Sequence, residues 1–533
     1  MSIRRIGLAL LAFAAAPGPI LETIAAEPNP LEPGATVIRV HWMGKEKLGA
    51  ETKAAGFMRI WREPVSARLE AQTLDKLALA PWRLLRGDAA TNGAPTKSMR
   101  ALLEDLVQSE SHLEVRRTAG RNDEIAFCIR LRPDQAGLWA TNLQRVVESL
   151  TGMRVSPGKQ GSGWSLKKHH APNLIQYMRV GDWMLIGLAQ EQNGLLDDFK
   201  SRIERDRTLF TPGKTNYWLE GSAELGAVGS LWPRDLNLPR SLPRLTFGVF
   251  GDGENVRVQG DLTTQGPLPE LEPWFVPTNL IHDPLISFTA VRGVKPWLAL
   301  IKGWDEYRPE PPPGQLFFWT MGGGPPQCYF AALTKDASSQ IKRLSGVLLH
   351  KTNPWLETNA IGSFVSTTNG GVRWSGVPFV SPFLEARRNS GVEYLYGGLL
   401  PAGSTNRPLP SVLLEAVLSR TNLVYYDWEL TSPRLAICLY VSQLFRVVMH
   451  KDQLPKQSAS ADWFARIGPQ LTSCVTVVNR ESQNRMSFVR RSTVGFTALE
   501  LQLVADWLES PDFPLGLHTT RSNLEKHLRP RVK

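Results

Sequence analysis

A chain of 533 residues is longer than one hydrophobic core usually organises, so its length favours two or more domains. Its composition, with 42% hydrophobic and 21% charged residues and 17 Trp, excludes a disordered or fibrous chain. The net charge of +11 is spread along the sequence, which favours a solvated surface and leaves weak attraction to anionic polymers as the alternative.

The N-terminus has the three parts of a secretory signal peptide. The basic segment Met1-Ser-Ile-Arg-Arg precedes the uncharged run Ile6 to Ala16, and Thr23-Ile-Ala-Ala supplies small residues for cleavage. The run is too short to span a bilayer, which takes about twenty residues; a short anchor or a buried helix is the alternative. We expect residues 1–26 to be removed, leaving a periplasmic or extracellular chain without a transmembrane span. Export argues against nucleic acid as a partner.

Helical and extended periods alternate through the body of the chain. Residues 64–79 and 98–108 predict helices, and apolar residues from Trp139 to Leu150 predict another. Between these helices, Ser111 to Arg117 and Glu124 to Leu131 predict a hairpin across polar turn residues. This alternation predicts an α+β fold of antiparallel sheets with packed helices.

The order of elements in the first half recurs in the second. A hairpin predicted from Gln315 to Leu333 precedes a helix, as the earlier hairpin does, and two further pairs of segments match in the same order. We infer an internal duplication, with one α+β unit over 35–276, a second over 283–510, and a joint at 266–283. Two unrelated α+β domains are the alternative.

The last predicted helix has a well-marked start. Thr497 and Glu500 have the spacing of a capping box, in which each side chain accepts a hydrogen bond from the backbone of the other residue. Apolar residues continue in helical phase as far as Leu508. Beyond this helix, we expect the basic segment 511–533 to be a loose tail.

The cysteines do not indicate a metal or redox centre. Cys128, Cys328, Cys438 and Cys474 are widely spaced and lack the pairing of a zinc knuckle or a Cys-x-x-Cys motif. We expect buried free thiols, and Cys438 with Cys474 is the pair to test for a disulfide. The sequence predicts no metal site and no cofactor.

Several segments carry a resemblance to known proteins. Leu74 to Trp82, Asn279 to Gly293 and Arg420 to Leu430 resemble secreted bacterial envelope proteins known only as domains of unknown function. The resemblance can be extended over most of the mature chain. It implies export, but it implies no activity and assigns no functional residue.

The stretch Arg420 to Leu430 gathers three aromatic and two acidic residues. A strand sends alternate side chains to opposite faces. Tyr425, Asp427 and Glu429 therefore share one face, which we expect to be polar and wet. The opposite, apolar core side carries Val424, Tyr426, Trp428 and Leu430. A groove lined by Tyr425, Asp427 and Glu429 is the candidate ligand-binding site, with the ring stacking on a sugar or an apolar group. A half-buried strand without a ligand is the alternative.

The two carboxylates are also candidates for a catalytic pair. Strand rise puts Asp427 and Glu429 roughly 6 to 7 Å apart, a spacing that overlaps the pairs of inverting glycoside hydrolases. Hydrolysis also needs one carboxyl group kept protonated by its surroundings. Neither the Gly-x-Ser-x-Gly elbow nor the His-Glu-x-x-His motif occurs in the sequence. No catalytic residue is therefore assigned.

The preferred hypothesis is a non-catalytic envelope binding or scaffold protein. Its sheets are expected to carry helices on one face and to leave the other face to contact an anionic envelope polymer, a lipid or a protein. A hydrolase acting on envelope carbohydrate is one alternative. A lipid-binding carrier, which would need an apolar cavity, is the other.

Overall fold

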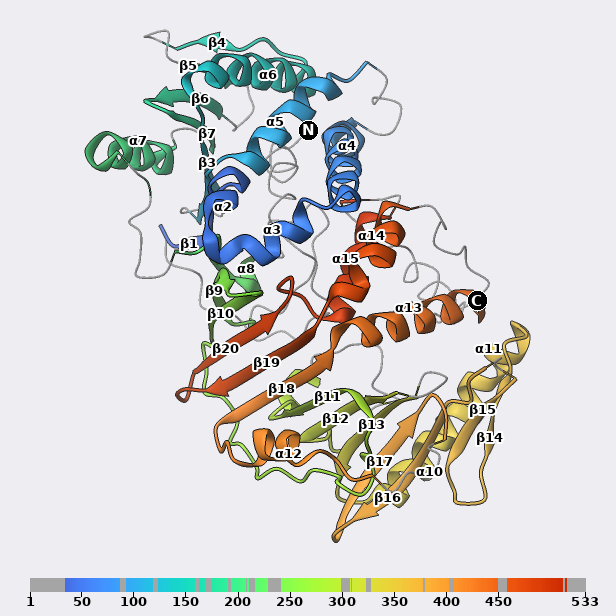
Figure 1. The fold of residues 1–533 in the computed structure, drawn as a ribbon. Coiled ribbons are helices and arrows are strands. Elements are labelled where there is room, and N and C mark those ends of the chain that lie inside the picture. Colours follow the sequence, from blue (N-terminus) through green and yellow to red (C-terminus); the bar gives the residue numbers. More distant parts are fainter. Residues whose placement is uncertain are drawn as a thin grey trace. The chain divides into compact units, whose positions relative to one another are not determined.

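The structure is a computed structural model in which two compact units can be followed (Figure 1). The first unit takes in the described residues up to Leu262 together with those from Val504 onward, and the second is Thr263–Leu503. The predicted signal segment 1–26 lies outside the described residues. The structure describes residues 34–86, 93–117, 123–158, 163–167, 174–189, 193–207, 209, 216–228, 241–298, 307, 309–322, 327–376, 379–401, 407–448, 458–510 and 513–514.

The first unit is built on an antiparallel sheet, as predicted. The strands of its hairpin, Ser111–Arg117 and Asp123–Arg130, begin and end within one residue of the positions predicted from the sequence. In spatial order the strands are β4 (Ser156–Pro157), β5 (Gly163–Lys167), β6 (Leu174–Val180), β7 (Trp183–Ala189), β3 (Asp123–Arg130), β2 (Ser111–Arg117), β1 (Thr36–Trp42), β8 (Leu219–Glu224), β9 (Arg244–Asp252) and β10 (Asn255–Thr263).

Helices cover both faces of this sheet. Helices α4 (Pro64–Arg86), α5 (Thr96–Gln108) and α6 (Pro133–Thr151) form the larger core on one side, and α7 (Gly194–Asp206) packs on the other. Alternate side chains of β3 point to opposite faces of the sheet and so enter different cores. Phe127 and Ile129 join the larger core, whereas Cys128 faces α7. Near the start of the chain, α2 (Lys45–Ala50) and α3 (Ala55–Trp61) pack on β9 and β10 in a smaller cluster.

The second unit is likewise built on antiparallel strands, here called the second sheet. Its strands are, in spatial order, β14 (Ser363–Ser366), β15 (Val372–Ser375), β16 (Phe383–Asn389), β17 (Val392–Gly398), β13 (Gln327–Thr334), β12 (Gln315–Met321), β11 (Leu285–Arg292), β18 (Leu423–Leu430), β19 (Ser473–Arg480) and β20 (Arg485–Ser492). The α+β class expected from the sequence is confirmed by both units.

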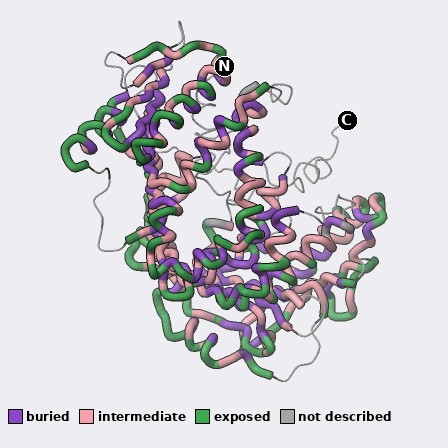
Figure 2. Tube along the Cα trace, turned by 45° about the horizontal axis from the view of Figure 1, so that its top comes forward, coloured by how far each residue is buried: buried purple, intermediate pink, exposed green. Residues whose placement is uncertain are grey.

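Helices also lie on both faces of the second sheet. On β13, Ala331 packs in the core that includes α12 (Ser411–Leu418), whereas Ala332 packs against α10 (Ala337–Val347). The expectation of helices on one face only is therefore wrong. Helices are needed on both faces because strands such as β7 and β13 have near-continuous apolar runs, which must be covered on both sides. Figure 2 shows the buried residues along the strands and the inward sides of the helices.

The two sheets have the same strand order. Each strand from β1 to β10 corresponds to the strand whose number is ten higher, so that β1 matches β11 and β8 matches β18. Helices recur at matching connections, α6 and α10 after the third strand of each unit and α7 and α12 after the seventh. Both first strands carry a register shift near their start, between Thr36 and Ile38 and between Leu285 and Ser287.

Each first strand is followed within two residues by a glycine with a positive backbone φ angle. Gly44 has φ 91 and Gly293 has φ 71, values that residues with a β-carbon rarely adopt, and a short helix follows each. The β-carbon of any other residue at position 44 would lie 2.7 Å from the carbonyl oxygen of Gln108. The turn after the first strand is therefore specified in the same way in both units.

Several local expectations can be compared directly with the structure. In the capping box, the N–H of Thr497 donates to Glu500 and the N–H of Glu500 donates to Thr497, at 2.9 and 3.3 Å, at the start of α15 (Ala498–Leu508). Of the predicted tail, Phe513 is buried against Trp507, and residues 515–533 lie outside the described part. Within the residues that can be followed, no helix has both the length and the apolar character to cross a membrane.

Candidate functional site

The strand β18 places the three predicted site residues on one side of the second sheet, but that side is not wet. Asp427 is 2% exposed and Glu429 is 0% exposed, while Tyr425 is partly buried. Helix α13 (Thr431–Val448), which follows β18 directly, packs over β11, β18 and β19. The expected solvated face is therefore a buried polar layer, because the next helix folds back over it.

One arginine on that helix joins both carboxylates. Arg434 Nη1 lies 2.8 Å from Glu429 Oε2 and 3.2 Å from Asp427 Oδ1. Thr289 on β11 also donates to the same oxygen of Asp427, Oδ1, at 2.5 Å, and the N–H of Ala498 donates to the other oxygen of Glu429, Oε1, at 2.8 Å. The carboxylates are thus acceptors for a strand and for two helices.

The ionisation of this cluster reflects its burial and its charges. Burial raises the pKa of Glu429, and the opposing effects of Arg434 and of the Ala498 N–H do not cancel that rise. Burial lowers the pKa of Arg434, but Asp427 and Glu429 raise it above its ordinary value. Burial and the neighbouring Asp427 raise the pKa of Tyr425. Tyr425 therefore stays a neutral phenol, and Arg434 stays charged.

A second ion pair lies beside Tyr425 on the same side. Arg490 on β20 donates to Oγ1 of Thr476 at 2.9 Å, and its two terminal nitrogens lie 2.6 and 2.9 Å from the carboxylate oxygens of Glu500. Glu500 is also the acceptor of the α15 capping box. The polar layer therefore fixes the start of α15 through Glu429 and again through Glu500.

All four cysteines are free thiols, and the Cys438–Cys474 pair is not a disulfide. Burial raises the pKa of Cys438 to about 11 and that of Cys474 to about 12. Thiols with such pKa values carry almost no thiolate at neutral pH, and the thiolate is the reactive form. They are structural residues of the interior rather than nucleophiles.

The first unit holds a different polar cluster, centred on His41 of β1. Nδ1 of His41 lies 3.1 Å from Glu220 Oε1 and Nε2 lies 3.2 Å from Glu110 Oε1. Only the imidazolium has an N–H on both ring nitrogens, so this geometry favours the charged ring. Burial lowers the pKa of His41, but the two glutamates raise it above its ordinary value of 6.5. Lys47 lies 2.6 Å from the other oxygen of Glu110.

The two polar clusters are not copies of one site. His112, the ring neighbour of His41, stacks on Phe199 of α7, whereas Tyr426, which faces away from Asp427, packs with α12. Helices α7 and α12 follow equivalent strands. The His41 cluster lies on the face that α7 covers, whereas the Asp427 cluster lies on the face opposite α12. The two clusters therefore lie on opposite faces of equivalent sheets. In the described part of the chain, no group of three acidic, histidine or cysteine side chains is suited to a metal ion.

Sequence reasoning missed Arg434 and His41. Arg434 lies in the first turn of α13, where the helix dipole disfavours a cation, so its position was a signal that acidic partners lie nearby. His41 gave no comparable signal, because Glu110 and Glu220 are distant from it in the sequence.

Compared with known proteins, the chain matches no family model, no curated protein and no solved structure.

Proposed function

We propose that this chain is an exported, non-catalytic binding or scaffold protein of the bacterial envelope. The observation that carries the proposal is the burial and ion pairing of Asp427 and Glu429. A catalytic carboxylate must reach its substrate, whereas these two are enclosed between a sheet and a helix. Their contacts support a structural role that holds α13 and α15 on the second sheet.

The partner we propose is an anionic envelope polymer. The net charge of +11 supports this choice, because a cationic protein attracts polyanions over the range of the Debye length. Binding of this kind weakens as salt is added. Titration of the purified mature protein with a polyuronate at low and at moderate ionic strength tests the proposal, and the absence of binding at both would refute it.

Export itself is part of the proposal, and it rests on the predicted signal segment 1–26. The test is expression of the full chain in a bacterial host, followed by mass measurement of the protein in the periplasmic fraction. A mass that corresponds to a mature chain beginning near Ala26 or Glu27 is expected. Retention of the whole chain in the cytoplasm would contradict export.

A hydrolase acting on envelope carbohydrate is the second candidate, and one observation favours it. Burial raises the pKa of Glu429, and a general acid of this chemistry needs a raised pKa. The discriminating experiment is a panel of glycan hydrolysis assays with the wild type, Asp427→Asn and Glu429→Gln. Turnover that both substitutions abolish, with the fold intact, would favour the hydrolase over the binding protein.

We also propose that the two units arose by duplication of one sheet-and-helix unit. The proposal is supported by their common strand order, by the register shift near the start of both first strands, and by Gly44 and Gly293. A core assembled independently would have no reason to repeat these three features together. Superposition of the two units is the test, and a mismatch in the path of equivalent strands would refute common descent.

A further inference from the structure

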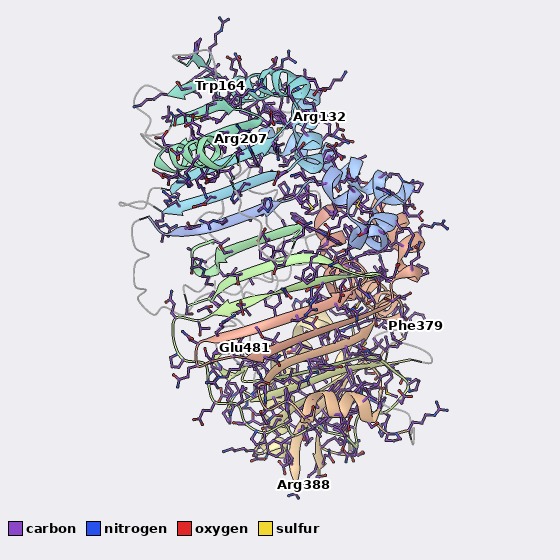
Figure 3. All side chains as sticks on the ribbon, turned by 60° about the vertical axis from the view of Figure 1, so that its left-hand side comes forward. Arg132, Trp164, Arg207, Phe379, Arg388 and Glu481 are labelled. Atoms are coloured by element: carbon purple, nitrogen blue, oxygen red, sulfur yellow. The ribbon has the colours of Figure 1, made fainter. Side chains whose placement is uncertain are left out.

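Three arginines converge on one buried glutamate on the α7 side of the first sheet. Glu114 on β2 is 1% exposed, and it is approached by Arg39 of β1, Arg116 of β2 and Arg202 of α7. Thr36 also donates to Glu114, at 3.0 Å. Figure 3 looks onto the face that carries α7, and Arg207 marks the end of that helix.

The hydrogen bonds within this cluster do not use all of its donors. Arg39 Nε lies 3.1 Å from Glu114, but Arg116 Nη2 and Arg202 Nη2 lie 3.7 and 3.9 Å away, beyond hydrogen-bond distance. Arg116 has a second partner in Asp198, at 2.8 Å. Arg202 donates to no acceptor within the described residues, and its Nε is buried without a partner.

Arg202 is nevertheless held in place. Its guanidinium carbon lies 4.7 Å from the centroid of the Phe199 ring, and Phe199 in turn stacks on His112 with ring centroids 5.5 Å apart. Phe199 is fully buried, so it gives the guanidinium a rigid base. The Arg202 side chain is still 30% exposed, which leaves an edge that a ligand can reach. A guanidinium that is fixed, accessible and has unused donors is suited to bind a planar or tetrahedral oxyanion.

The charges of the cluster also favour an anionic ligand. Three guanidinium groups face two carboxylates, those of Glu114 and Asp198, so positive charge is in excess. Charge neutralisation of Glu114 needs one cation, which Arg39 supplies at hydrogen-bond distance. A third arginine at 3.9 Å adds little to that pairing, and a structural role for Glu114 therefore leaves Arg202 unexplained.

We propose that Arg39, Arg116 and Arg202 bind an oxyanion group, a carboxylate or a phosphate, carried by an anionic polymer of the envelope. This inference rests on the proposed binding function and names its site. Arg202 and the half-exposed Arg39 supply free N–H donors to the oxyanion, and Arg116 adds charge from the neighbouring position on β2. The bound group accepts from the N–H groups at the exposed edge of Arg202, which donate to no acceptor within the described residues.

The test is calorimetric titration of the mature protein with polygalacturonate and, separately, with inorganic phosphate. Arg202→Gln removes the charge and the fork of donors, and we expect it to weaken polymer binding about tenfold. The matched control is Arg205→Gln on the same helix, where Arg205 is 71% exposed and pairs with its neighbour Asp206. The control changes the net charge equally and is expected to leave binding unchanged.

The outcomes separate the site from the function. If the wild type binds polymer and Arg202→Gln binds equally well, or if Arg205→Gln loses as much affinity, the site is wrong and the proposed function stands. If phosphate binds in a manner that depends on Arg202 but polymer does not bind, the site stands and the polymer function fails. Binding of neither probe overturns both. Should Arg202→Gln not fold, Arg202→Lys, which keeps the charge and loses the planar fork, takes its place.

Discussion

The backbone N–H of Ala498 donates to Oε1 of Glu429 at 2.8 Å, so a side chain on β18 anchors the first residue of α15. The other oxygen of Glu429 accepts from Arg434 in the first turn of α13. One buried carboxylate therefore joins a strand to the starts of two helices that follow it in the chain. A carboxylate at a helix N-terminus also complements the helix dipole.

Loss of Arg434 is expected to destabilise the second unit strongly. Arg434→Met leaves Asp427 and Glu429 buried without their cation, and removal of one partner from a buried ion pair costs about 3–5 kcal/mol. Urea unfolding of the wild type and the variant measures the difference. The exposed Arg420, changed to Met, is the control and is expected to stay within about 0.5 kcal/mol of the wild type.

Removing all three charges together is expected to be less harmful than removing one. In Asp427→Asn, Glu429→Gln, Arg434→Met, no buried charge is left unpaired, so a part of the stability lost in Arg434→Met returns. The same urea titration makes the comparison. A triple variant that is less stable than Arg434→Met would show that the cation is not what the carboxylates require.

The stability of the first unit is expected to depend on pH through His41. The pKa of His41 is raised above 6.5 in the folded chain, so the folded state holds this proton more tightly than the unfolded state does. The stabilisation is therefore complete below pH 6.5 and is lost as the pH rises through the folded pKa. Comparing the free energy of unfolding of the wild type with that of His41→Gln on both sides of pH 6.5 measures this effect. A difference that does not change with pH would mean that folding leaves the pKa of His41 unshifted, and a stabilisation by His41 that grows as the pH rises would mean that the ring is neutral in the fold.

Glu110 is expected to give the opposite dependence. Although burial raises its pKa, His41 and Lys47 lower it from 4.5 to about 2, so its stabilisation is present above pH 4.5 and is lost as the pH falls toward 2. Glu110→Gln should remove this acid sensitivity. The measurement is thermal unfolding of both proteins between these pH values, and equal acid sensitivity would argue against the pairing with His41.

The end of the described chain is expected to be essential to the first unit. Trp507, Leu508 and Phe513 pack against its larger core, and Lys76 of α4 lies 3.3 Å from Glu509. A chain that ends at Leu503 lacks all of these contacts, and the loss of large buried aromatic side chains costs about 3–5 kcal/mol each. A chain that ends at Pro514 is the control. Equal melting temperatures for the two truncated chains would contradict this assignment.

The four thiols are expected to stay reduced and unreactive in the folded protein. Burial and high pKa values suppress the thiolate of Cys438 and Cys474, so a thiol reagent should label them only when the chain unfolds. Labelling followed by mass measurement, with and without denaturant, tests this. A disulfide between Cys438 and Cys474 in the native protein would contradict the structure.

Local features were predictable because the groups that make them are close in the sequence. The capping box joins Thr497 to Glu500, three positions apart, and its pattern needs no knowledge of the rest of the molecule. The faces of β18 followed in the same way from strand geometry. The helices that cover those faces could not be predicted in this way. Helix α13 covers one side and α12 covers the other, and a hydrophobic pattern alone does not say where a helix packs.

Spacing within a few residues was enough to predict the α+β class, the alternation of hairpins and helices, and the position of Asp427 and Glu429 on one side of a strand. Long-range packing sets the rest: this side is buried, Arg434 neutralises it, and Arg39, Arg116 and Arg202 meet at Glu114. Arg39 and Glu114 are partners across two strands, and Arg202 arrives on a helix much later in the chain. Electrostatic contacts of this kind are set by strand order and helix docking, which the free energy of the whole core decides.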